Sequence, residues 1–155
     1  MRKVQRWRYY CDHCTKAGQS GYHMANHEKH CTLNPLRECR MCLHINGGNG
    51  TDVAEMLALL PDPAAYMRTI TSETDGWITD APFDVLDDAK IKPVIEAAMP
   101  ALRELTESCP VCIMAAFRQR KIPLPLVESF DFKREKQELW NGINEEKQER
   151  EHAYY

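Results

Sequence analysis

Apolar residues in the middle of the chain repeat at the three- and four-residue spacing of α-helices. Val53, Met56 and Leu60 begin the pattern, and Pro61 ends the first predicted helix. The same spacing predicts further helices at about residues 63–70, 83–90, 93–108 and 113–120. In the helix at 93–108 we expect Val94 and Ile95 to face inward. The chain is therefore predicted to be mainly α-helical.

The two ends of the chain have different patterns. Residues 6–10 mix basic and aromatic side chains, which favours a short strand leading into the first cysteine pair. We expect other β structure only at the cysteine pairs. From Asp131 the sequence predicts a highly charged helix with few side chains to bury, namely Phe132, Leu139, Trp140 and Ile143. This helix is expected to dock by its first half, or alternatively to serve as an arm that binds a partner.

Composition narrows the class of protein. A chain of 155 residues is long enough for a small zinc module joined to a helical domain, and seven glycines do not favour a barrel or sandwich. Without a run of 18 apolar residues or the apolar stretch of a secretory signal, we expect no membrane span and a cytoplasmic location.

The first candidate metal site lies near the N-terminus. Cys11, Cys14, His27 and Cys31 follow the spacing C-x2-C-x12-H-x3-C. Two thiolates two residues apart fit a tight knuckle, whereas His27 and Cys31 share one face of a helix, so the four can complete a tetrahedron around zinc. Ser20 is the expected cap of that helix, and Asn34-Pro35 its end.

A second site can be formed by the remaining cysteines, which are Cys39, Cys42, Cys109 and Cys112. Its two pairs are separated by 66 residues, so the intervening helices must bring them together. We therefore predict two zinc ions, with disulfides as the alternative. The expected architecture is a zinc finger at 1–35, a helical domain at 36–127 closed by the four-cysteine site, and a charged tail at 128–155. The glycine-rich residues 43–50 are expected to be a plain linker.

Residues 9–31 resemble the two-cysteine two-histidine zinc finger in its variant with cysteine as the last ligand. Tyr9 supplies the aromatic residue two before the first cysteine, and Met24 the apolar residue three before the histidine. Gly18 stands where the family carries a core aromatic residue, so we expect a thin core. His30 is a competing ligand with poorer spacing than Cys31.

Charge is distributed unevenly along the chain. Residues 1–42 carry a net charge of +5, residues 43–108 carry −8, and the whole chain carries −3. A basic zinc end beside an acidic middle favours oriented association with a charged partner. The possible nucleic-acid contacts at the basic end are Arg6, Trp7, Arg8, Lys29, Arg37 and Arg40.

The chemistry of the predicted sites argues against an enzyme. A catalytic zinc needs an open coordination position, and both predicted sites offer four protein ligands. The chain also contains neither HExxH nor His-x-Glu. We therefore expect a non-catalytic zinc-binding adaptor that binds a protein. The alternative is a regulatory protein that binds DNA or RNA through the basic zinc end.

Residues 6–42 also resemble the small uncharacterised zinc proteins of tailed phages. The likeness lies in Tyr10-Cys-Asp-His-Cys14 and in His27-Glu-Lys-His-Cys31, followed by Arg37-x-Cys39-x-x-Cys42. This resemblance implies a viral accessory protein that acts in the host cytoplasm on a host or viral protein, but it implies no biochemical activity.

Overall fold

The computed structural model describes residues 7–70 and 82–152. Within them the elements are β1 (Tyr9–Tyr10), β2 (Ala17–Gly18), α1 (Gly21–His30), α2 (Arg40–Asn46), α3 (Val53–Leu59), β3 (Met67–Ile70), β4 (Phe83–Leu86), α4 (Asp88–Leu105), α5 (Pro110–Arg120) and α6 (Phe132–His152). Two 3₁₀ turns lie at Pro63–Tyr66 and Leu124–Leu126. The predicted fold class, mainly α with small β elements, is confirmed. None of the described helices is both long and apolar enough to cross a membrane.

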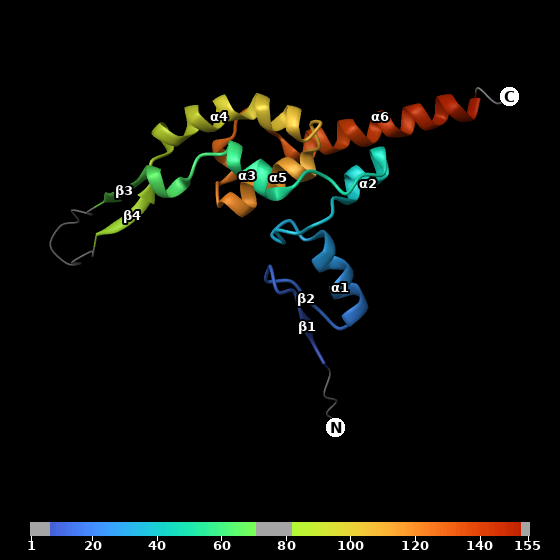
Figure 1. The fold of residues 1–155 in the computed structure, drawn as a ribbon, viewed down its shortest axis with the longest axis horizontal. Coiled ribbons are helices and arrows are strands. Elements are labelled where there is room, and N and C mark those ends of the chain that lie inside the picture. The colour runs from blue at the N-terminus through green and yellow to red at the C-terminus, as the bar shows by residue number, and fades with distance from the viewer. Residues whose placement is uncertain (1–6, 71–81, 153–155) are drawn as a thin grey trace.

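The main core is built by α3, α4 and α5, with the first half of α6 against it (Figure 1). Phe117 of α5 and Met56 of α3 are fully buried at its centre. One face of α4 packs along the core, and its buried residues follow helical spacing: Ile91, Ile95, Met99 and Leu102. We call this part, residues 37–70 and 82–152, the body.

Helix α4 starts earlier than the sequence analysis expected. Asp87 caps it by accepting a hydrogen bond from the backbone N–H of Lys90 at 3.3 Å. Pro93 therefore lies inside the helix rather than at its start. The added turn brings Ile91 into the core, while Val94, expected to face inward, is 38% exposed.

The helices predicted at 63–70 and 83–90 are wrong in part, because β3 and β4 pair as an antiparallel hairpin over residues 67–70 and 83–86. The expectation that β structure is limited to the cysteine pairs and the entry strand was wrong for the same reason. Their register runs from Met67 opposite Leu86 to Ile70 opposite Phe83. Thr69 Oγ1 also donates to Asp84 Oδ1 across the strands at 2.7 Å. Runs of four residues are too short to display a helical period, and pairing satisfies their backbone. The run Ser72-Glu-Thr-Asp-Gly76 predicts a loop, and it lies outside the described residues.

The zinc-finger-like unit, residues 9–31, is a β1–β2 hairpin followed by α1, and Figure 1 shows it apart from the helices of the body. Its buried residues are only Cys11, Met24 and Cys31. The terminal methyl of Met24 reaches within 3.3 Å of where a Gly18 side chain would start, so Met24 fills the place of the missing aromatic residue. The prediction of a thin core is confirmed.

Both ends of α1 follow from local chemistry. Ser20 caps its start, as predicted, by accepting a hydrogen bond from the His23 N–H at 3.3 Å. The helix ends at His30, before the expected Asn34-Pro35, because Cys31 takes an extended backbone conformation.

Polar contacts attach the segment directly after this unit to the end of α5. Arg118 Nη1 donates to Thr32 Oγ1 at 2.8 Å, and Gln119 Nε2 donates to the carbonyls of Thr32 and Asn34 at 2.9 and 3.0 Å. The predicted division at residues 35 and 127 stays a prediction.

Helix α6 docks by its first half. Arg103 of α4 donates to both oxygens of Glu135 at 2.8 and 2.9 Å, and the Trp140 ring packs edge-on against His44. Residues 144–150 are exposed. Figure 1 shows this second half projecting beyond the body.

Candidate metal centres

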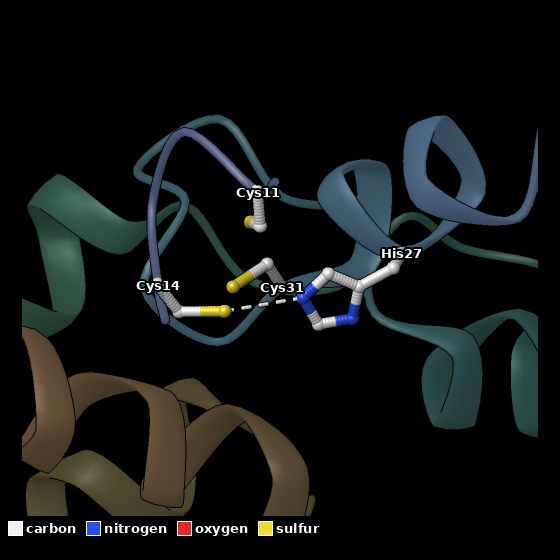
Figure 2. Close-up of side chains that lie close together, drawn as sticks. All are labelled: Cys11, Cys14, His27 and Cys31. Atoms are coloured by element: carbon white, nitrogen blue, oxygen red, sulfur yellow. Dashed lines mark hydrogen bonds between the residues drawn. The ribbon is translucent and has the colours of Figure 1, made fainter. Parts of the chain in front are cut away.

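The first metal cluster, which we call the finger cluster, gathers four side chains from both halves of the finger. Cys11 follows β1, Cys14 lies in the knuckle, His27 is in the last turn of α1, and Cys31 caps that helix. Figure 2 shows their ligand atoms converging, and all lie within 4.8 Å of one another.

The spacing of these atoms fits zinc. Cys14 Sγ lies 3.3 Å from His27 Nε2. Tetrahedral zinc with ordinary bonds places a sulfur and a nitrogen about 3.5 Å apart. Two further N–H groups point at the sulfurs, from His13 to Cys11 at 3.4 Å and from Lys16 to Cys14 at 3.5 Å.

The protonation states at the finger cluster follow from these contacts. The backbone N–H of Lys16 lowers the pKa of Cys14, which favours the thiolate. Burial lowers the pKa of His27 and so favours the neutral imidazole that can bind metal. Burial instead raises the pKa of Cys31. Metal binding there must therefore displace a proton.

The second cluster, the four-cysteine cluster, lies at the starts of two helices. Cys39 is the N-cap of α2 and Cys109 the N-cap of α5, with Cys42 and Cys112 one turn further along each helix. All four are between 0% and 7% exposed and belong to the main core.

The sulfur distances fit zinc and exclude disulfides. Cys39 Sγ and Cys109 Sγ are 3.7 Å apart, as are Cys42 Sγ and Cys112 Sγ. A disulfide requires about 2.05 Å, whereas two sulfurs on tetrahedral zinc lie about 3.8 Å apart. The two clusters are thus compatible with two zinc ions, one in each.

Four buried thiols cannot all ionise without a cation. Burial raises the pKa of Cys42 to about 12, and hydrogen bonding with Cys112 raises that of Cys109 as well. Hydrogen bonding from Cys109 and Cys112 lowers the pKa of Cys39. One thiolate is therefore held by its protonated neighbours until a divalent cation replaces the protons.

Arg37 is buried against the four-cysteine cluster. Its Nη1 donates to Cys112 Sγ at 3.8 Å, and the residue is only 7% exposed. Its Nε is buried, and no hydrogen-bond partner for it is found among the described residues. Zinc with four thiolates carries a net charge of −2, which the guanidinium partly offsets. The expectation that Arg37 contacts nucleic acid is therefore corrected, because its charge faces the core.

The glycine-rich segment covers the cluster rather than linking two parts. Residues 43–46 belong to α2, and the Cys39 N–H donates to the Asn49 carbonyl at 2.6 Å. A Cβ on Gly50 would lie 2.5 Å from Cys39 Cβ, and the Gly50 φ is +92°. Only glycine fits there. The expectation of a plain linker was wrong.

The remaining predicted contacts lie on the surface. Trp7 is 83% exposed, and Arg8, Lys29 and Arg40 are exposed too. Lys29 pairs with Glu38 at 3.0 Å. Arg6 lies outside the described residues, and a role in nucleic-acid binding stays a prediction for all five. His30, the competing ligand, does not belong to either cluster, and its Nδ1 donates to the Glu38 carbonyl at 3.1 Å.

Sequence reasoning missed Arg37 and Gly50 as parts of the second site. An available signal was their closeness in sequence to Cys39, with an arginine two residues before the pair and a glycine where the chain turns back. Comparison of the chain with protein-family models, with curated proteins and with solved structures finds no match.

Proposed function

We propose that this chain is a non-catalytic zinc-binding adaptor that binds another protein. The observation that carries the proposal is that each cluster supplies four protein ligands, and that one cluster lies wholly inside the core. Catalytic zinc keeps a position open for water or substrate, whereas structural zinc does not. Ions held in this way would stabilise surfaces used for binding.

The surface around the finger supports a protein partner. Leu36 and Tyr22 are 89% and 79% exposed, and Tyr10 is 64% exposed. Large aromatic and apolar side chains left in water are typical of protein interfaces, where their burial contributes most of the binding energy. The net charge of −3 argues against strong non-specific binding to nucleic acid.

Nucleic-acid binding is the second candidate, favoured by Trp7. This indole is 83% exposed beside the exposed Arg8, a pairing that allows stacking on a base with a phosphate contact alongside. On the resemblance of residues 6–42 alone, we also propose that the protein is a phage accessory protein. It would then act in the host cytoplasm on a host or viral protein.

The deciding experiment is affinity capture from a bacterial lysate with and without nuclease treatment. The adaptor proposal expects a stoichiometric protein that remains after nuclease treatment. Recovery of nuclease-sensitive material alone would favour the second candidate. In that case affinity should fall steeply as the salt concentration rises. This salt dependence should be weaker in the Arg6→Ala/Arg8→Ala variant, because fewer phosphates are then neutralised.

A further inference from the structure

Helices α3 and α4 leave an open groove on the face of the body away from the core. We call it the α3–α4 groove; it has a volume of about 560 Å³ and is lined by Glu55, Ala58, Leu59, Ala101, Glu104 and Leu105. Each helix contributes three residues spaced i, i+3 and i+4, which share one face of a helix. The groove is therefore a continuous surface formed by two helices rather than by a loop.

The floor of this groove is apolar, and two of its side chains are small. Ala58 and Ala101 are small, so another helix backbone can approach closely. Leu59 is 37% exposed, whereas Val53 and Met56 on the inward side of α3 are 3% and 0% exposed. Leu59 is thus a large apolar side chain that the core does not use.

The rim of the groove is acidic, and its negative charges are not paired with basic side chains of the described residues. Glu55 and Glu104 are exposed, and neither takes part in the ion pairs of the described part of the chain. Among the described residues, no lysine or arginine lines the groove. A neighbouring cavity of about 320 Å³ shares Glu55 and Leu105 and adds Asp52 and Glu107 to its lining. The nearby Arg103 forms a bidentate salt bridge with Glu135 instead of pairing with the rim of the groove.

We propose that the α3–α4 groove binds a basic amphipathic α-helix of a partner protein. Apolar residues of that helix at i, i+3 or i+4, and i+7 would cover Leu59 and the two alanines. Lysine or arginine on its flanks would pair with Glu55 and Glu104, since complementary charge fixes the register and excludes other partners. This inference rests on the proposed adaptor function and names the chemistry of its partner.

The test uses selection from a random library of 14-residue peptides on the immobilised, zinc-loaded chain. We expect the enriched peptides to be basic, with apolar residues at helical spacing. Their affinity should fall tenfold or more for the Glu55→Lys/Glu104→Lys variant, because like charges then face each other. The matched control is Glu145→Lys/Glu149→Lys, which makes the same change of net charge on the exposed half of α6 and should leave affinity unchanged.

A second pair of variants tests the apolar floor. Leu59→Ser should weaken peptide binding, whereas Leu43→Ser, at 39% exposure on α2, should not. No enriched peptide, acidic enriched peptides, or equal affinity for Glu55→Lys/Glu104→Lys and its control would overturn the proposal. Dimerisation of the chain that this variant abolishes would also overturn it, because the occupant would then be a second copy.

The groove and the adaptor function can fail separately. A lysate protein captured equally by the wild-type chain and by Glu55→Lys/Glu104→Lys would overturn the groove assignment and leave the adaptor function standing. Capture of nucleic acid alone would instead contradict the adaptor function.

Discussion

The two metal clusters share their chemistry but lie in opposite surroundings. The four-cysteine cluster is part of the main apolar core, which also contains Ile113 and Phe117. The finger cluster has only Met24 as a buried apolar side chain besides its own ligands, and Cys14 and His27 are partly exposed. An ion in the finger would therefore take the place of a hydrophobic core, whereas an ion in the body would close a loop around a core that already exists.

The largest loss of stability is expected when the four-cysteine cluster can no longer link the two ends of the helical region between its cysteine pairs. Cys109→Ser removes the link that spans the 66 residues between Cys42 and Cys109. The free energy of unfolding should fall by about 4 kcal/mol in the cross-link entropy model, and bound zinc should fall from two ions to one. Chemical denaturation and elemental analysis measure both. Retention of two zinc ions would contradict the assignment of this ligand.

Cys11→Ser should instead produce a local effect. The finger buries too little apolar surface to fold without metal, so residues 9–31 should unfold while the body keeps its stability. Hydrogen exchange reports this directly, as lost protection in α1 and unchanged protection in α4 and α5. Unfolding of the whole chain would show that the two regions are not energetically separate.

The sequence predicts the candidate metal ligands, because their spacing along the chain reveals them. It does not predict features that depend on how distant segments pack. The eight candidate ligands were found from spacing alone: six form three cysteine pairs in which each pair can serve one ion, and His27 and Cys31 share one face of a helix. The β3–β4 hairpin was missed because Met67–Ile70 and Phe83–Leu86 gain strand structure only by pairing with each other. Gly50 and Arg37 were missed because their roles depend on how the chain packs over Cys39 and Cys112.

Gly50→Ala tests that close packing over the four-cysteine cluster. The added Cβ would meet Cys39 Cβ in a conformation that alanine already disfavours, so stability should fall by about 3 kcal/mol. Gly47→Ala is the matched control, because Gly47 has φ +71° with no atom within 4 Å of its added Cβ. It should cost only about 1 kcal/mol. Equal losses in thermal or chemical denaturation would argue against the close approach.

Arg37→Met tests the charge beside the four-cysteine cluster. Loss of the guanidinium should weaken zinc binding about ten- to hundredfold, as is typical for groups that contact metal ligands. Competition with a chelator measures the affinity, and Arg40→Met, an exposed neighbour, should leave it unchanged. The finger cluster serves as an internal reference in the same chain.

The smallest expected difference between the two clusters is in how steeply their zinc affinity depends on pH. Without metal, Cys42 has a pKa raised to about 12 and that of Cys109 is raised too, so both are protonated near neutral pH. Zinc must displace these protons, so affinity falls as pH falls, by up to about tenfold per pH unit for each proton released. The slope should be shallower at the finger cluster, where the pKa of Cys31 is raised but those of Cys14 and His27 are lowered. Calorimetry in buffers of different ionisation enthalpy counts the protons.

The capping positions of Cys39 and Cys109 point the starts of α2 and α5 at the same set of sulfurs. A helix start carries part of a positive charge, from the aligned dipoles of its peptide groups. Two such ends facing each other repel unless an anion lies between them. A zinc–tetrathiolate complex is that anion, whereas two disulfides would be neutral. Oxidation would therefore leave the helix dipoles opposed inside the core, and the fold itself favours the metal-bound, reduced state of these four cysteines.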